Sequence, residues 1–144
     1  MRARNIGYWI TTALVATVLV AGGLSDLMGA PPVVETMAHL GYPSYVASIL
    51  GVWKLLGAIA ILAPGAGRVK EWAYAGIAFD LTGAIVSHAS VGDTVAQYAA
   101  PIVLLALAAT SWALRPASRR LASPADASSR SSGMSVAPAH ASAA

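Results

Sequence analysis

The sequence predicts an all-α protein: an integral membrane four-helix bundle with a short outer interfacial helix and a disordered C-terminal tail. Two observations predict this fold class. The chain has 144 residues, of which 57% are hydrophobic and only 10% are charged, whereas soluble domains carry about 25% charged residues. The apolar residues also fall into four stretches of about 20 residues, the length that a helix needs to cross a hydrocarbon core of about 30 Å.

The four expected spans follow one another with turn signals between them. We place them at roughly Ile6–Met28, Ser44–Ala63, Glu71–Ala89 and Ala96–Leu114. The breaks, at 29–32, 41–43, 64–67 and 92–93, hold the Gly, Pro and Asp residues that stop helices and form turns. A cleaved signal peptide is the alternative interpretation of the first stretch, but its apolar run is longer than the core of a signal peptide.

The positive charges predict the orientation of these spans. Eight of the nine Lys and Arg residues lie on one side of the four-span arrangement, and the ninth is Lys54. Because cytoplasmic loops are rich in Lys and Arg, both termini are expected in the cytoplasm. The chain is therefore predicted to be a multi-pass protein of the cell (inner) membrane, with the lipid bilayer as its first partner. This placement also accounts for the basic composition without a nucleic-acid partner.

Two further segments complete the predicted organisation. Residues 31–40 are expected to form the interfacial helix, because Pro31 and Pro32 suit a helix start and Gly41 followed by Pro43 suits a stop. The segment 116–144 is rich in Ala, Ser, Pro and Arg and poor in large apolar residues, so it is predicted to be disordered. The predicted domains are a four-span membrane domain at 1–115 and a disordered cytoplasmic tail at 116–144.

Lys54 and Asp80 are the main candidate site residues, because each lies near the middle of an expected span. A charge at bilayer depth is costly, so it is kept where it is paired or used. We predict that Lys54 and Asp80 form an ion pair between the second and third spans. The pair either fixes the register of the helices or lines a path for a small molecule or protons; the remaining alternative is that the two residues do not meet. Trp53, beside Lys54, lies too deep for an interfacial aromatic belt and joins the candidates.

Small residues share the predicted faces of these two charges. They are Ala47, Gly51, Gly57 and Ala58 in the second span, and Gly76, Gly83, Ala84 and Ser87 in the third. Small residues allow helices to approach closely in lipid. Gly51, Gly57, Gly76 and Gly83 are therefore predicted to be buried at helix contacts.

A second group of polar candidates is expected at the outer face. It contains three carboxylates and two histidines: Asp26, Glu35, His39, His88 and Asp93. Such a group could shuttle protons or ligate a cation, and it is equally what an ordinary solvated loop region contains. Glu35 and His39 lie four residues apart on one helix, but two ligands without a clear third do not define a metal site, so no metal is predicted.

The composition also bears on cofactors. The chain has no cysteine, which excludes iron–sulfur ligation by the chain itself. It has no Gly-rich dinucleotide motif and no pair of histidines inside the spans, so no cofactor is evident and an electron carrier has no obvious ligands. This favours a non-enzymatic role and leaves an enzyme as an alternative.

Seven short stretches between Ile6 and Arg115 carry a resemblance to a known family. They are Ala21–Leu27, His39–Pro43, Leu50–Gly57, Lys70–Gly76, Phe79–Ala84, Ser87–His88 and Gly92–Asp93. In this order and spacing they resemble the DoxX-like small membrane proteins. The resemblance implies a compact four-helix bundle in the cell membrane and a link to respiratory or redox complexes, because the family takes its name from a subunit of a quinol-oxidising system. It implies no catalytic residue.

Three classes of function remain after these considerations. The favoured class is a non-catalytic subunit or accessory of a redox or quinone-linked membrane assembly, with other membrane redox proteins or quinone as partners. The second is a small-molecule or proton pathway protein that uses the mid-membrane Lys–Asp pair. The third is an enzyme acting on a lipid-soluble substrate such as a quinone. The sequence leaves the oligomeric state open and allows a homo-oligomer.

Overall fold

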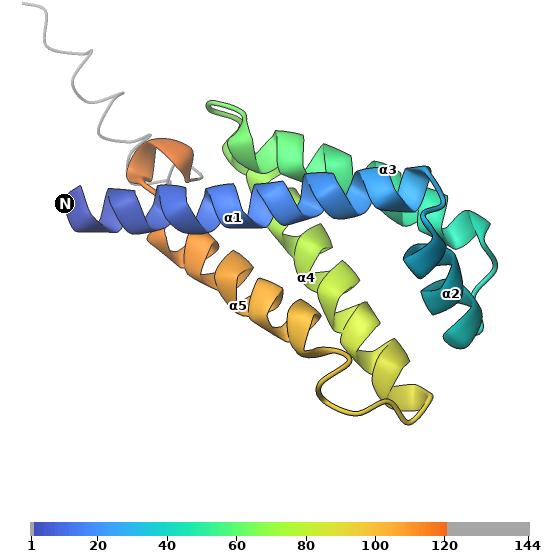
Figure 1. Ribbon diagram of the computed structural model, residues 1–144. Helices are drawn as coiled ribbons and strands as arrows, with labels where there is room; N and C mark the ends of the chain where they lie inside the picture. Colours follow the sequence, from blue (N-terminus) through green and yellow to red (C-terminus); the bar gives the residue numbers. More distant parts are fainter. Residues whose placement is uncertain (1, 121–144) are drawn as a thin grey trace, which may run out of the picture.

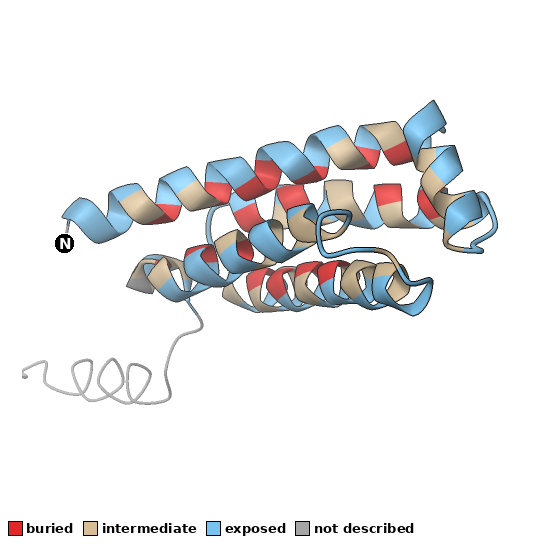
Figure 2. Ribbon diagram, turned by 60° about the horizontal axis from the view of Figure 1, so that its bottom comes forward, coloured by how far each residue is buried: buried red, intermediate tan, exposed pale blue. Residues whose placement is uncertain are grey.

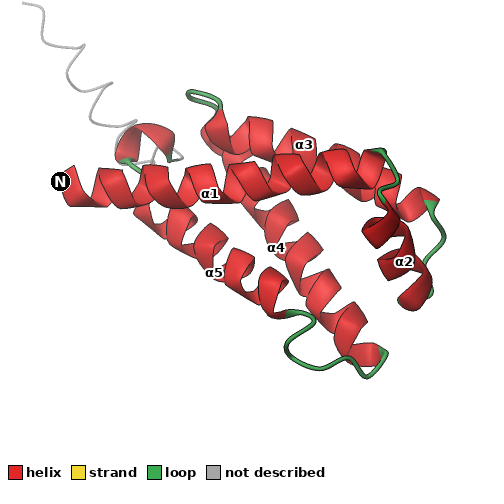
Figure 3. Cartoon of the chain, in the orientation of Figure 1, coloured by secondary structure: helices red, strands yellow, loops and turns green. Residues whose placement is uncertain are grey.

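The computed structural model describes residues 2–120, and all regular structure within this range is helical (Figure 3). The four long helices are α1 (Arg2–Leu27), α3 (Tyr45–Leu62), α4 (Gly67–Ser90) and α5 (Ala99–Leu114). The short helix α2 (Pro31–His39) connects α1 to α3, and a 3₁₀ turn, η1 (Ala117–Arg119), follows α5. The four predicted spans and the predicted short helix are thus all confirmed as helices.

Length and apolar character differ among the long helices. Arg2–Leu27 and Tyr45–Leu62 are long and apolar enough to cross a membrane. Helix α5 is equally apolar in character but has 16 residues. Helix α4 has 24 residues and is the longest after α1, but it carries the charged residues Arg68, Lys70, Glu71 and Asp80.

The long helices pack in a ring in which each runs antiparallel to its neighbours. Helix α1 packs against α3 and α5, and α4 completes the ring by packing against the same two helices. Helix α2 lies across one end, beside the start of α3, and α4 and α5 diverge from α1 and α3 toward that end (Figure 1). We call it the α2 end. The opposite end, with the N-terminus, the α3–α4 turn and η1, is the terminal end.

The buried residues form stripes on the inner faces of the helices (Figure 2). In α1 they recur every three or four positions, which is the period of one helix face: Tyr8, Thr12, Val15, Ala16, Leu19, Gly23 and Asp26. The apolar core lies in the middle of the ring and toward the terminal end, and draws on all four long helices. Its buried members are Val15, Ala16, Leu19, Ala58, Ile61, Tyr74, Ile77, Leu81 and Ala108.

The predicted packing face of α3 is confirmed, whereas the predicted burial of the two glycines of α4 is wrong. In α3, Gly51 is buried and Gly57 lies against the Ile77 side chain. In α4, Gly76 and Gly83 are exposed, and a Cβ at either would meet nothing within 4 Å. The buried residues of α4 are Lys70, Tyr74, Ile77 and Leu81. The buried face of the helix is thus rotated by about one residue from the prediction, and large side chains rather than glycines fill the core on this side.

Two basic residues of the terminal end are buried rather than solvated. Lys70 is fully buried, and its Nζ donates hydrogen bonds to the carbonyls of Ala60 (2.9 Å), Ile61 (3.2 Å) and Ala63 at the end of α3. These carbonyls belong to the last turn of a helix, where acceptors lack partners and a positive charge is favourable. Lys70 therefore holds the α3–α4 turn closed.

Arg115 joins α5 to α4 at the same end. Its NH2 group donates to Glu71 Oε1 at 2.7 Å, and its guanidinium lies 5.1 Å from the Tyr74 ring centroid. Beyond it, Arg119 in η1 donates to the Tyr8 hydroxyl at 3.3 Å. The chain thus packs on the bundle as far as η1. The rest of the segment predicted to be disordered, residues 121–144, lies outside the described residues.

Candidate functional site

A cavity of about 620 Å³ occupies the α2 half of the ring. This volume lies within the range of small-molecule sites in proteins, about 300–1,000 Å³. Its walls come from all five α-helices and are mostly apolar. Its polar wall residues are Asp26, Thr36, Tyr42, Lys54, Asp80, Ser87 and His88. Leu19 and Leu81 also line it and belong to the core, so the core forms its floor.

Lys54 pairs with Asp26, and the predicted Lys54–Asp80 ion pair is wrong. The Nζ of Lys54 donates to Asp26 Oδ2 at 2.7 Å, and the two side chains are 24% and 9% exposed. The reason is the spacing of the helices. Helix α1 touches α3 beside this pair, where a Cβ on Gly51 would lie 3.0 Å from Asp26 Cβ, whereas the cavity separates α3 from Asp80 on α4.

Asp80 lies in the cavity wall without a partner among residues 2–120. It accepts none of the hydrogen bonds formed within that range, and it lies within electrostatic reach of both Lys54 and Asp26. The wall therefore holds one ammonium group and two carboxyl groups. Lys54 is held by Asp26, and the carboxyl group of Asp80 remains open to the cavity.

A second polar group closes the α2 end. Asp93 accepts hydrogen bonds from His39 Nε2 (2.8 Å to Oδ1 and 3.1 Å to Oδ2) and from His88 Nδ1 (2.6 Å to Oδ2). Gln97 Nε2 is a third donor, at 2.9 Å. These bonds join α2 to the end of α4 and to the α4–α5 loop. His39 therefore bonds to Asp93 across the fold rather than to Glu35 four residues before it.

The bonds from the two imidazoles also set the charge state of the loop carboxylate. The hydrogen bond from His88, followed by that from His39, lowers the pKa of Asp93 from its usual 3.8. The bonds stabilise the ionised form, and so the group stays negative over a wider range of acidity. A further bridge, between the Tyr42 hydroxyl and Ser87 Oγ at 2.8 Å, fastens the α2–α3 loop to α4 beside it.

The remaining candidates lie apart from these groups. Glu35 is exposed and forms no side-chain hydrogen bond with any other residue of the described range. Trp53 is 66% exposed on the outer side of α3 and does not line the cavity. The five outer candidates therefore divide into the group around Asp93, the pair of Asp26 with Lys54, and the separate Glu35. Within residues 2–120 no three His, Asp or Glu side chains are placed to hold a metal ion.

Sequence reasoning missed a buried chain of hydroxyl groups near the terminal end. The Thr12 hydroxyl donates to the carbonyl of Tyr8 at 2.6 Å and contacts Ser111 Oγ at 2.6 Å. Ser111 Oγ in turn lies 2.7 Å from the Tyr74 hydroxyl. One direction satisfies all three groups: Tyr74 donates to Ser111, and Ser111 donates to Thr12. Thr12 and Ser111 are hydroxyl residues inside apolar stretches of the sequence. Their position could have indicated that they form hydrogen bonds to each other between helices.

The fold and the cavity define a class of protein: an all-helical chain whose apolar helices enclose a ligand-sized space with charged groups in its wall. Residues 10–111, well over half of the chain, match the DoxX-like family. The chain belongs to this family and is a small membrane protein. No curated protein and no solved structure matches it.

Proposed function

We propose that this protein is a non-catalytic subunit or accessory of a quinone-linked membrane assembly, and that it holds a quinone-type molecule in the cavity of about 620 Å³. The cavity is the observation that carries the proposal. Its apolar walls suit the ring and tail of a lipid-soluble molecule. Lys54 is a hydrogen-bond donor and Asp80 an acceptor in the same wall, and together they suit a head that carries both carbonyl and hydroxyl oxygens in its two redox states.

The proposal includes four membrane spans with both termini in the cytoplasm. Every Lys and Arg of the described range except Lys54 belongs to the terminal end. The α2 end instead carries the carboxylates Asp26, Glu35 and Asp93. This asymmetry supports a cytoplasmic terminal end and places α2 on the outer face of the cell membrane.

Lateral access from the bilayer also supports a lipid-soluble ligand. Phe79 and Gly83 line the cavity from α4 and are themselves exposed, Phe79 by 76%. Val18 lines it from α1 and is 49% exposed. These residues lie along the sides of the bundle, where a membrane protein faces lipid. A molecule dissolved in the bilayer could therefore reach the cavity without passing through water.

The arrangement supports a binding site more than a pathway across the membrane. A pathway needs a polar or open connection between the two ends of the bundle. Leu19, Ile77 and Leu81 are almost fully buried in the core between the cavity and the terminal end. Tyr74 and Ser111 lie beyond them, bonded to each other. The cavity is thus open on one side of a packed apolar core.

The proposal is tested by measuring the quinone that co-purifies with the protein. The protein is purified in a mild detergent, its lipids are extracted, and quinone is quantified per protein by chromatography. We expect enrichment over an unrelated membrane protein from the same cells. Ala84→Phe should abolish the enrichment because Ala84 lines the cavity, whereas Ala75→Phe on the exposed face of α4 should retain it.

Substitutions of the polar wall residues test whether the protein recognises the quinone head or whether quinone simply partitions into an apolar cavity. Lys54→Met and Asp80→Asn should each lower the quinone content, and Trp53→Phe, beside Lys54 but outside the cavity, should not. Equal quinone content in Ala84→Phe and the unaltered protein would contradict the proposal. A flavin or haem absorption band in the pure protein would favour the enzyme alternative, and the proteins that co-purify would identify the assembly.

A further inference from the structure

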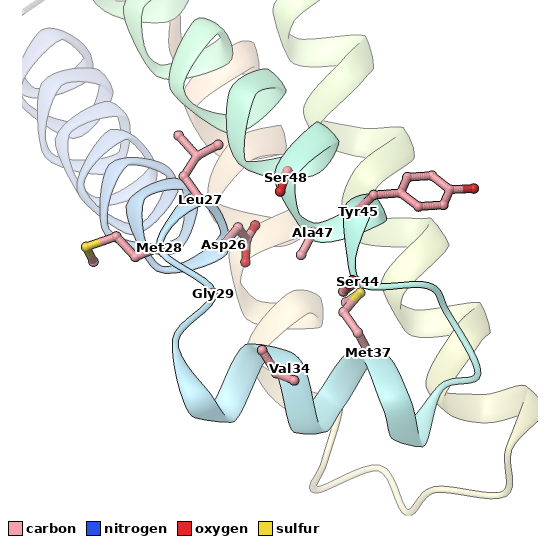
Figure 4. Close-up of a pocket in the computed structure, with 10 residues that line it drawn as sticks. All are labelled: Asp26, Leu27, Met28, Gly29, Val34, Met37, Ser44, Tyr45, Ala47 and Ser48. Atoms are coloured by element: carbon pink, nitrogen blue, oxygen red, sulfur yellow. The ribbon is translucent and has the colours of Figure 1, made fainter.

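Asp26 borders two separate cavities. It lines the large cavity together with Lys54 and Asp80, and it also lines a smaller pocket of about 290 Å³ at the α2 end. The smaller pocket lies between the end of α1, helix α2 and the start of α3 (Figure 4). In Figure 4 the carboxylate of Asp26 lies above α2 and beside the start of α3. Ser48 is drawn on the side of α3 that faces Asp26. Asp26 is the single charged residue among those that line the smaller pocket.

The two cavities differ in chemistry. The smaller pocket is lined by the hydroxyl residues Ser44 and Ser48 together with Asp26, and it lies at the α2 end of the bundle. Its volume of about 290 Å³ is several times the roughly 30 Å³ that a water molecule occupies in the liquid. A pocket holds water where it has room for a water molecule and polar partners for it, and the Asp26 carboxylate with the two serine hydroxyls supplies such partners.

Asp26 connects the two spaces through one hydrogen bond. Its Oδ2 accepts the bond from Lys54 Nζ at 2.7 Å, and Lys54 lines only the large cavity. Of the charged groups that face Asp26, Lys54 comes from α3 and Asp80 from α4. Helix α2 contributes only Val34 and Met37 to the smaller pocket. No second charge therefore competes for the carboxylate from that side.

We propose that Asp26 relays protons between outer water in the smaller pocket and the head of the molecule in the large cavity, with Lys54 as the intermediate donor. This inference rests on the proposed function. When a redox protein of the assembly has delivered electrons to a quinone, an N–H bond of Lys54 breaks and an O–H bond forms on the head. The Asp26 carboxylate then takes a proton from hydronium in the smaller pocket and passes it to the neutral amine, which restores the ion pair between Asp26 and Lys54. Release from a quinol follows the reverse order.

The absence of cysteine from the chain allows a direct test of water access. Single variants Ser48→Cys, in the smaller pocket, and Ala84→Cys, in the large cavity, are placed in proteoliposomes and exposed to membrane-impermeant methanethiosulfonates, one cationic and one anionic. Ser48→Cys should react from the face that carries α2, and Ala84→Cys should react at least about tenfold more slowly, because charged reagents avoid an apolar space.

The same variant reports the charge of Asp26. In Ser48→Cys the cationic reagent should react faster than the anionic one. Adding Asp26→Asn should lower that ratio by up to about 25-fold, because one unit charge at about 4 Å in water speeds the cationic reagent and slows the anionic reagent by about fivefold each. Reaction of Ser48→Cys with permeant reagents only would show a dry pocket and overturn the relay. An unchanged ratio in the double variant would overturn it as well.

The final experiment tests coupling to a ligand. The probe is 2-heptyl-4-hydroxyquinoline N-oxide, whose fluorescence changes on binding to quinone sites, added to proteoliposomes with the pH fixed separately on each side. Its affinity should change several-fold with the pH on the α2 face and stay constant with the pH on the other face, and Asp26→Asn should remove the dependence. Binding that ignores the outer pH, or that keeps its dependence in Asp26→Asn, overturns the relay alone. No binding at any pH contradicts the proposed function and the relay together.

Discussion

Gly23 of α1 and Gly51 of α3 touch through their backbones. The carbonyl oxygen of Gly51 lies 2.9 Å from the position that a Cβ on Gly23 would take, and the Gly23 carbonyl lies 2.8 Å from the position of a Cβ on Gly51. Neither oxygen can move without its helix. This contact holds α1 and α3 at backbone distance. A Cβ on Gly51 would also lie 3.0 Å from the Cβ of Asp26, so the position of the Lys54–Asp26 bond depends on this contact.

Gly51→Ala should therefore destabilise the protein although alanine is the better helix former. The new methyl group meets backbone and must push α1 and α3 apart, and overpacking of this kind costs about 1–3 kcal/mol. The matched control is Gly76→Ala, where a Cβ meets nothing within 4 Å and helix propensity favours alanine by up to about 1 kcal/mol. Thermal unfolding in detergent measures both variants. Equal midpoints would show that α1 and α3 are not in backbone contact.

The Lys54–Asp26 pair is expected to couple in a double-mutant cycle. Lys54→Met and Asp26→Asn should each destabilise the bundle, because removal of one partner of a buried pair costs about 3–5 kcal/mol in soluble proteins. The double variant should recover part of the loss, since no unpaired charge remains. Strict additivity of the two losses would show that the residues do not interact.

The same cycle with Asp80 provides the comparison. Lys54 and Asp80 form no ion pair in the described structure, so Lys54→Met with Asp80→Asn should show a clearly smaller coupling energy. Free energies of unfolding from denaturant titration of the reconstituted bundle measure both cycles. A larger coupling energy between Lys54 and Asp80 than between Lys54 and Asp26 would contradict the observed ion pair and support the pair predicted from the sequence.

The hydroxyl chain gives a third prediction, on the terminal half of the bundle. Ser111→Ala leaves the Tyr74 hydroxyl without its acceptor and the Thr12 hydroxyl without its donor, and an unsatisfied buried polar group costs about 1–3 kcal/mol. The control is Thr110→Ala, because Thr110 is exposed and bonds only to the Ala106 carbonyl of its own helix. Thermal unfolding should separate the two variants. A neutral Ser111→Ala would mean that the chain of bonds adds nothing to stability.

Much of the fold follows from the sequence because its signals are local. Twenty apolar residues between helix breakers predict a long helix, and Pro31 and Pro32 predict the start of α2. The buried face of α3 is also predictable, since Gly51 and its small neighbours follow one helix period. These features depend on residues close together in the chain, and the structure places them as expected.

The partners of the charged residues depend instead on how helices rotate and diverge, which no local pattern reports. Lys54 has carboxylates on both neighbouring helices, and the closer approach of α1 selects Asp26. The glycines of α4 follow the same period as those of α3, but Tyr74 and Ile77 take the inner face and pack in the core. The sequence places Lys70 at the same end of the chain's helices as the other basic residues, and the structure agrees. The sequence gives no sign that the Lys70 ammonium group donates hydrogen bonds to the last carbonyls of α3.

The last prediction concerns the pH dependence of stability at the α2 end. Hydrogen bonds from His88 and then His39 lower the pKa of Asp93 below its unfolded value of 3.8. The folded state thus binds fewer protons at this group than the unfolded state does. Asp93 therefore stabilises the fold at pH values above 3.8, and this contribution is lost as the pH falls through the lower, folded-state pKa.

Comparison with Asp93→Asn isolates this contribution. The unaltered protein should be more stable than the variant at neutral pH, and the two unfolding midpoints should converge as the pH falls below 3.8. Glu35→Gln, at an exposed carboxylate of the same end, should show no such convergence. His88→Ala should raise the pKa of Asp93 more than His39→Ala does, because the His88 bond has the larger effect and is the shorter, at 2.6 Å against 2.8 Å. A difference between the unaltered protein and Asp93→Asn that persists unchanged into acid would show that the two imidazoles do not hold this carboxylate.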